Sequence, residues 1–175
     1  MGIASLLSVT EILFIRYGKS DRDLAVDDFD RPLKKKGKHD LQCLAKWMVN
    51  EQIIPDNIIS SPAIRALSTA KIIQSEVADM LSLNIDKRLY QEGIERIKEV
   101  LSECPIQSKK VLLVGHNPEL EHILINFVGA VNLPDTNKLL PTSTLVRLRM
   151  PEDWSVLESG CASLISITYA KLLSE

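Results

Sequence analysis

Short apolar runs alternate along most of the chain with segments that repeat apolar residues at helical spacing. The runs at 11–16, 57–60 and 110–115 have the length and continuous hydrophobicity of strands that are buried on both faces of a sheet. Ser61 and Pro62 predict the N-cap and the first residue of a helix. The other predicted helices cover about 40–51, about 91–101 and the segment that Asn117-Pro118 opens.

The tail of the chain follows a different pattern, because apolar and polar residues alternate at 146–150 and at 165–169. Such alternation predicts strands with one covered face. Strands that alternate with helices are typical of a layered α/β sandwich with a mostly parallel sheet. At this length we expect a single domain over residues 1–175, with its core at about 11–170.

Composition and charge exclude several classes of protein. With 45% hydrophobic and 25% charged residues, this chain can form a core without disulfides or metal. The formal charge of −2 gives no general attraction to nucleic acid or to acidic membranes. The three cysteines (Cys43, Cys104 and Cys161) have neither metal nor redox spacing, and the first ten residues lack the pattern of a signal peptide. We therefore expect a cytoplasmic protein with reduced thiols.

Basic residues follow the three buried strands. Arg16 ends the first strand, Arg65 comes shortly after the second, and His116 follows the third. Because the carboxyl ends of parallel strands meet at one edge of a sheet, we expect these side chains to lie close together. Two guanidinium groups, an imidazole and a helix N-terminus together suit a phosphoryl dianion. Taken alone, each residue is more often a salt-bridge partner or a helix cap than a ligand, so the prediction of an anion site depends on all three.

Five short motifs lie at or near these positions. They are Phe-Ile-Arg-Tyr-Gly at 14–18, Asp-Phe-Asp-Arg-Pro-Leu at 28–33, Ser-Ser-Pro-Ala-Ile-Arg at 60–65, Val-Gly-His-Asn-Pro-Glu-Leu-Glu at 114–121 and Pro-Thr at 141–142. Together they resemble the histidine phosphatase superfamily, and within it the short bacterial phosphohistidine phosphatases. The resemblance extends from about residue 11 to about 168, and the motifs are specific jointly although each is weak alone.

The resemblance implies a three-layer α/β/α sandwich of the phosphoglycerate mutase-like kind. It also implies a phosphatase that needs no metal or other cofactor, with a phosphorylated protein or a small phosphorylated compound as its partner. In the family, a histidine attacks the phosphorus atom and becomes phosphorylated for a time. Carried over residue by residue, Arg16, Arg65 and His116 would hold the phosphoryl oxygens, and the catalytic candidates would be Tyr17 and His116.

Tyr17 departs from the family pattern, because it occupies the position of the nucleophilic histidine. A phenol has a pKa near 10, so only about one part in a thousand is ionised at pH 7, although nearby arginines lower that value. A phosphate ester on tyrosine would also be far more stable than a phosphohistidine. We therefore expect hydrolysis to be impaired while the anion pocket survives.

The proton donor also departs from the pattern. Many members of the family carry a glutamate shortly after the third strand of the family fold. This chain has Gln91 at the corresponding position, and Glu92 is the adjacent candidate acid. Two hypotheses therefore stand beside each other. The chain is either an impaired phosphohistidine phosphatase-like enzyme or a catalytically inactive pseudophosphatase that binds phosphate or a phosphoprotein.

Overall fold

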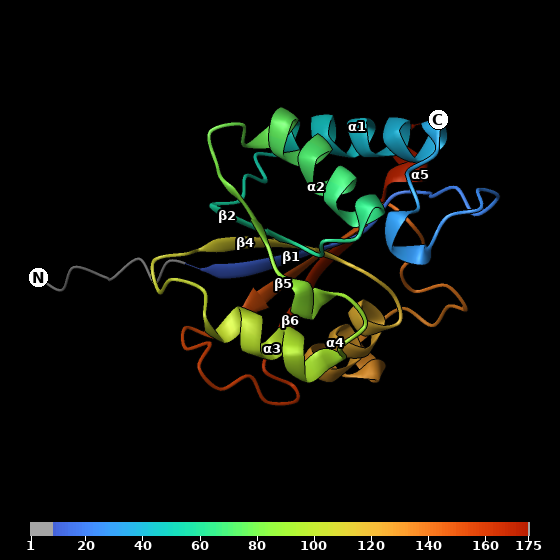
Figure 1. Cartoon of the computed structure of the whole chain (residues 1–175). Helices are drawn as coiled ribbons and strands as arrows, with labels where there is room; N and C mark the ends of the chain where they lie inside the picture. The colour runs from blue at the N-terminus through green and yellow to red at the C-terminus, as the bar shows by residue number, and fades with distance from the viewer. Residues whose placement is uncertain (1–8, 175) are drawn as a thin grey trace, which may run out of the picture.

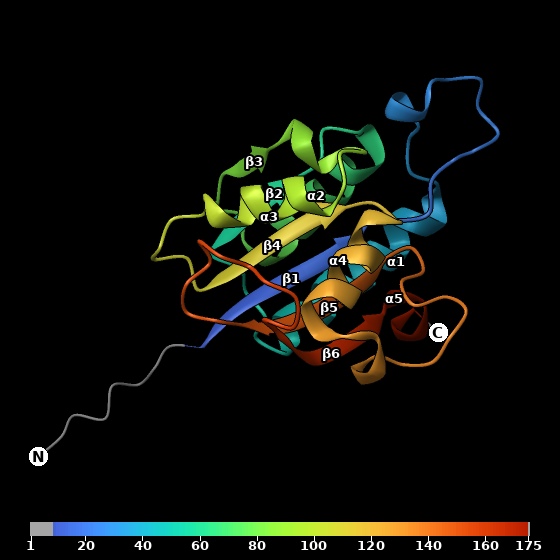
Figure 2. The same cartoon turned by 90° about the horizontal axis from the view of Figure 1, so that it is seen from below.

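The computed structural model describes residues 9–174. The prediction that the first ten residues form no signal peptide therefore concerns residues outside this range, except for residues 9 and 10. A sheet of six strands in the order β3-β2-β4-β1-β5-β6 forms the centre of the fold (Figure 2). The first four strands in that order are parallel, β5 is antiparallel to β1, and β6 is antiparallel to β5. The strands are β1 (Thr10–Arg16), β2 (Asn57–Ser60), β3 (Leu83–Ile85), β4 (Lys110–Gly115), β5 (Thr144–Met150) and β6 (Ser163–Tyr169).

Helices cover both faces of this sheet (Figure 1). One face carries α1 (Lys35–Asn50), α2 (Ile64–Val77) and the short α5 (Ala170–Leu173), and the other carries α3 (Ile94–Ser102) and α4 (Glu119–Val128). The 3₁₀ turns are η1 (Asp28–Asp30), η2 (Lys87–Leu89) and η3 (Ala130–Asn132). This arrangement confirms the α/β/α architecture. Within residues 9–174, no helix is long and apolar enough to span a membrane.

The central strands are apolar throughout because each of their faces meets a helical layer. In β1, Ile12 and Phe14 pack into the core under α3 and α4, whereas Leu13 and Ile15 pack into the core under α1 and α2. All four side chains are fully buried. The apolar run that predicted this strand is therefore continuous because its residues alternate between two separate cores, one on each side of the sheet.

Several helix boundaries differ from the prediction. The first helix begins at Lys35 and not at about residue 40, because its first turn is polar and gives no apolar periodicity. Gly37 lies in that turn, and a Cβ atom there would be 2.4 Å from the carbonyl oxygen of Lys19. The glycine therefore allows close contact between α1 and the chain that follows β1.

Two further helices begin later than predicted, and one strand was not predicted. The hydroxyl of Ser61 accepts a hydrogen bond from the amide of Ala63, but the N-cap of α2 is Ala63 itself. Similarly, α3 begins at Ile94 and not at about residue 91. The strand β3 has only three residues and lies at the edge of the sheet, so it has too little length to show a pattern.

The carboxyl ends of three parallel strands are in register. Arg16 at the end of β1 pairs with Gly115 at the end of β4, and Ser60 at the end of β2 pairs with the residue before that glycine. The amide of Tyr17 donates to the carbonyl of Gly115, and the amide of Ser61 donates to the carbonyl of Val114. The residues that follow these strands are thereby brought to one edge of the sheet, as predicted.

Candidate active site

Arg16 and Tyr17 are fixed by the segment that leads into β5. The Nη1 atom of Arg16 donates a 2.7 Å hydrogen bond to the carbonyl of Leu140. The amide of Ser143 donates to the carbonyls of both Arg16 and Tyr17 at 3.2 Å. The Tyr17 side chain is almost completely buried, with 5% of the residue exposed. The position that departs from the family pattern is therefore a rigid part of the site.

Arg65 lies in the first turn of α2 and is held from the opposite side by Asp28 of η1. Its Nη1 atom donates to the Asp28 carbonyl at 2.5 Å, and its Nη2 atom lies 2.9 Å from the Asp28 carboxylate. The guanidinium carbon is 4.7 Å from the ring centre of Tyr17, and that of Arg16 is 5.5 Å from the same ring. Two guanidinium groups thus approach one phenol ring.

His116 follows β4 and packs against two tyrosine rings. Its ring centre is 5.2 Å from that of Tyr17 and 5.5 Å from that of Tyr90. Its Nε2 atom lies 2.7 Å from the hydroxyl of Ser61, and its Nδ1 atom is buried with no hydrogen-bond partner among the described residues. Burial, reinforced by the charge of Arg65, lowers the pKa of His116 to about 4. The imidazole is therefore neutral at pH 7.

The acidity of Tyr17 reflects opposing effects. Burial raises the pKa of its hydroxyl, whereas hydrogen bonding to Arg16 and the charges of Arg16 and Arg65 lower it. The arginines outweigh the burial, so the pKa lies below its ordinary value of 10.0. The two cations therefore stabilise negative charge at the position that Tyr17 occupies.

Asp28 organises the basic side of the site. Its carboxylate accepts a hydrogen bond from the hydroxyl of Tyr90 at 2.7 Å, and it lies 3.0 Å from Arg31 and 2.9 Å from Arg65. Burial raises the pKa of Asp28, but the hydrogen bonds from Tyr90 and Arg65 outweigh it and lower that pKa. The carboxylate is therefore ionised at pH 7, and it offsets part of the positive charge of the two arginines.

Sequence reasoning missed the contact between Asp28 and Arg65, and it also missed Tyr90. The motif at 28–33 places Asp28 three residues before Arg31, a spacing that signals a local ion pair. The longer-range partners come from α2 and from the end of η2, and only the fold brings them together. The ring of Tyr90 also packs edge-on against that of Phe29, with 5.3 Å between the ring centres, which adds an aromatic wall beside His116.

The candidate acid Glu92 does not join this group. Its carboxylate lies 3.8 Å from the guanidinium of Arg96, four residues along, and is half-exposed. Among residues 9–174, no hydrogen bond or ion pair links it to Tyr17 or His116. Gln91 has a positive φ of 60° and lies in the bend that precedes α3. The structure thus brings four of the five predicted site residues together and leaves Glu92 at the surface.

The site consists of two guanidinium groups, a neutral imidazole and a phenol, at the carboxyl edge of the sheet. Its donors suit an anion. No group of three or more histidine, cysteine or acidic side chains that could hold a metal ion occurs within residues 9–174. What the arrangement can do chemically is to bind an oxyanion and to stabilise negative charge next to Tyr17.

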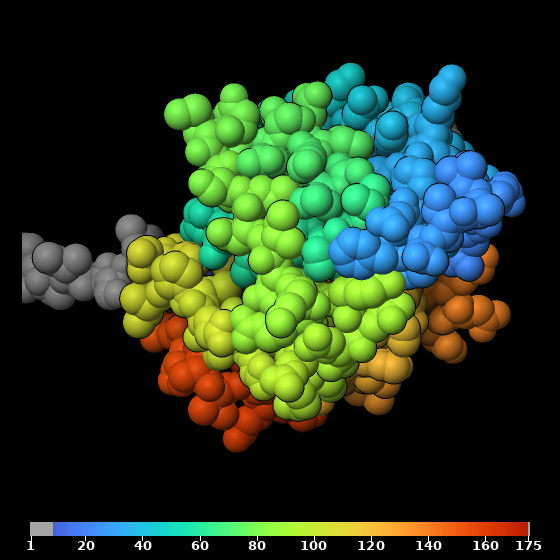
Figure 3. Space-filling model, viewed as in Figure 1, coloured from blue at the N-terminus to red at the C-terminus, as the bar shows by residue number. Residues whose placement is uncertain are grey.

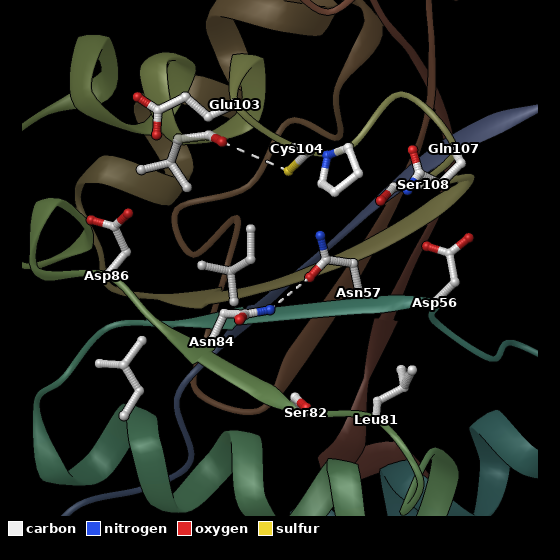
Figure 4. A pocket seen from close by; sticks show the side chains of 14 residues that line it. Asp56, Asn57, Leu81, Ser82, Asn84, Asp86, Glu103, Cys104, Gln107 and Ser108 are labelled. Carbon is white, nitrogen blue, oxygen red and sulfur yellow. Dashed lines mark hydrogen bonds between the residues drawn. The ribbon is translucent and has the colours of Figure 1, made fainter.

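A separate cavity of about 520 Å³ lies between the β2–β3 edge and the segment that follows α3 (Figure 4). On its β2–β3 wall, the side-chain amide nitrogen of Asn84 donates a 3.1 Å hydrogen bond to the amide oxygen of Asn57. The thiol of Cys104 points toward the Val100 carbonyl, and burial, with Asp56 and Glu103 nearby, raises its pKa to about 11. This thiol is protonated at neutral pH and is not activated.

Comparison with known proteins shows which family this chain resembles. The family model described as "Histidine phosphatase superfamily (branch 1)" matches residues 12–93. A protein named SixA from Agrobacterium tumefaciens has the same fold, with a TM-score of 0.76 and 24% identity over 91% of this chain and 97% of that one. These findings confirm the resemblance to the histidine phosphatase superfamily, and the fold is the phosphoglycerate mutase-like fold.

Two other relatives extend this comparison. A protein histidine phosphatase SixA, solved in complex with tungstate, has a TM-score of 0.79 and 18% identity over 94% of this chain and 99% of that one. An uncharacterized protein of Mycobacterium tuberculosis is 26% identical over 156 residues, which are 86% of this chain and 96% of that protein. The chain therefore matches these relatives over nearly their whole length.

Proposed function

We propose that this chain binds a phosphoryl group between Arg16, Arg65 and His116, as a phosphohistidine phosphatase-like protein. The observation that carries the proposal is the convergence of two guanidinium groups on Tyr17, beside a buried neutral imidazole. The SixA protein solved with tungstate supports it, because tungstate is a tetrahedral oxyanion like phosphate. The substrate in this proposal is a phosphorylated protein or a small phosphorylated compound, and the location is the cytoplasm.

Hydrolysis in this proposal is independent of metal and is impaired by Tyr17. Attack by the Tyr17 oxygen requires loss of the phenolic proton, which Arg16 and Arg65 favour but burial opposes. His116 is neutral, so it can donate one hydrogen bond to a phosphoryl oxygen without a full positive charge. Its buried Nδ1 atom, which has no partner among residues 9–174, is the nitrogen that remains free for this contact.

A second candidate function is that of an inactive pseudophosphatase that binds phosphate or a phosphoprotein. It is favoured by the position of Glu92, which pairs with Arg96 and contributes no acid to the site. A leaving group such as imidazole needs less help from an acid than an alkoxide does, so phosphohistidine is the substrate with which activity would survive best. The two candidates share one pocket and differ only in turnover.

Phosphate binding tests the shared part of both candidates. We expect orthophosphate to bind the chain, as measured by calorimetry, and the substitution Arg65→Met to weaken that binding at least about 30-fold, because a buried charged donor is lost. Arg149→Met is the matched control, since Arg149 is exposed on β5. It lies opposite Glu11 in the strand register, near the end of β1 that is remote from the site. Equal affinities in the native chain and both variants would overturn the pocket assignment.

A further inference from the structure

A cavity of about 430 Å³ lies beside Tyr17. Its lining includes Tyr17 but none of Arg16, Arg65 and His116, so it adjoins the proposed phosphoryl pocket without being part of it. The residues that line it come from the segment after β1, the N-cap position of α1 and the segment before β5. They are Tyr17, Lys19, Ser20, Arg22, Asp23, Lys34 and Thr142.

The backbone of this cavity is held in place by short contacts. The amide of Lys34 donates to the carbonyl of Lys19 at 2.8 Å, and Ser20 and Leu33 form an antiparallel bridge. The close approach of Gly37 fixes the Lys19 backbone from the other side. The segment around residues 20–33 also lies at the surface, where Figure 3 shows it in blue. The cavity therefore has a fixed base and is open to a ligand from solution.

The charges of this lining are not balanced. Three side chains are cationic and one is a carboxylate, Asp23, which lies 3.2 Å from the ammonium of Lys34. Lys19 and Arg22 have no carboxylate within 4.0 Å among the residues that the structure describes. Two uncompensated cations next to a phosphoryl pocket favour a ligand with a second negative group.

We propose that this cavity binds a second anionic group of the substrate, a carboxylate or a phosphate that is covalently linked to the transferred phosphoryl group. This inference rests on the proposed function, because it places the phosphoryl group itself beside Tyr17. Lys19 and Arg22 contact the second group, and Lys34 remains paired with Asp23. The cavity thus selects among phosphorylated compounds, and compounds with a single phosphate and no other charge bind more weakly.

The test compares orthophosphate with tripolyphosphate, which carries further phosphates on the same chain of atoms. We expect the native protein to bind tripolyphosphate at least about tenfold more tightly, and the double variant Lys19→Met, Arg22→Met to lose most of that preference while its orthophosphate affinity stays within about twofold. The matched control is Lys46→Met, Lys71→Met, which removes two exposed cations from α1 and α2 outside the cavity.

Three results would distinguish failure of this inference from failure of the proposed function. If the control loses the preference as strongly as the cavity variant, tripolyphosphate responds only to net charge and the inference is wrong. If orthophosphate fails to bind but tripolyphosphate binds through Lys19 and Arg22, the cavity is confirmed as an anion site and the proposed function fails. If orthophosphate binds and the native chain shows no preference, the proposed function stands and this inference is overturned.

A second arm separates the two sources of the anionic group. Two peptides that carry a phosphonate analogue of phosphohistidine, one with flanking aspartates and one with flanking serines, are titrated into the native chain and into the Lys19→Met, Arg22→Met variant. A preference for aspartate that disappears in the variant identifies an acidic protein segment as the source. A preference for tripolyphosphate with no such peptide preference identifies a second phosphate instead.

Discussion

Arg65 and Arg88 both form close ion pairs, but the charge around them differs. The guanidinium of Arg88 lies 2.7 Å from the carboxylate of Asp86, 2.6 Å from that of Glu103 and 3.8 Å from that of Glu99, so three negative groups surround one positive group. Among residues 9–174, Arg65 pairs only with Asp28, which also pairs with Arg31. Negative charge is therefore in excess around Arg88, whereas positive charge is in excess around Arg65.

Burial makes this difference consequential. The Arg88 side chain is 24% exposed, whereas that of Arg65 is 4% exposed. Uncompensated charge at a surface is screened by water and salt, but in a buried site it acts strongly on its neighbours. A short ion-pair distance therefore does not distinguish these two arginines, whereas the balance of charge around each pair and its burial do.

The largest of these effects is expected at His116, where burial, reinforced by the positive charge of Arg65, lowers the pKa. Its pKa is about 4 in the folded chain and about 6.5 when unfolded, so between these values the unfolded state binds more protons. Above about pH 6.5, the titration of His116 does not lower the free energy of unfolding. As the pH falls to 4, up to about 3 kcal/mol of that free energy is lost. Urea denaturation over this range measures the loss, and His116→Gln should remove it. A variant with the same pH dependence as the native chain would contradict the assignment.

Removal of the negative charge at Asp28 should sharpen the contrast with Arg88. Asp28→Asn keeps an oxygen for Arg65 and Tyr90, but it leaves both Arg65 and Arg31 without a counterion. We expect orthophosphate to bind about two- to fivefold more tightly to this variant, as measured by calorimetry, because the pocket becomes more positive.

The same variant should change how the free energy of unfolding depends on pH in the acid range. The lowered pKa of Asp28 gives stability that is present above its unfolded value and lost as the pH falls through its folded value. Asp28→Asn should therefore be less stable at pH 7 but lose less stability than the native chain below about pH 4. Weaker phosphate binding by the variant would mean that Asp28 acts mainly by holding Arg65 in place.

The smallest effect is expected at Arg88, whose positive charge is outweighed by that of its carboxylate partners. Arg88→Met removes contacts to Asp86 and Glu103, which are partly or largely exposed, so thermal unfolding should shift downward by no more than about 3 °C. Orthophosphate affinity should be unchanged. A loss of affinity comparable to that of Arg65→Met would show that charge balance does not separate the two residues.

The sequence predicted the strands that carry the site because their continuous burial leaves a plain signal. Register then followed from a general property of parallel sheets, and it placed Arg16, Tyr17, Arg65 and His116 at one edge. The start of α1 escaped prediction because its first turn is polar. The edge strand β3 escaped it because three residues are too few to show a period.

Contacts between distant segments were beyond the reach of the sequence. The pairing of Asp28 with Arg65 spans 37 residues, and that of Tyr90 with Asp28 spans 62. Neither has a local pattern, because both depend on how η1 and η2 pack against α2. Glu92 was a candidate acid only by its position in the sequence, and the path of the chain before α3 directs it toward Arg96.

The central claim is that the phosphoryl pocket is intact and lacks its nucleophile. The most direct test is to measure turnover of the native chain and of Tyr17→His on an aryl phosphate and on a phosphohistidine peptide. We expect the histidine variant to exceed the native chain by at least about 1000-fold on the better substrate, in line with the loss that follows removal of a nucleophile. Equal rates would mean that Tyr17, His116 or water performs the attack, and the claim would be wrong.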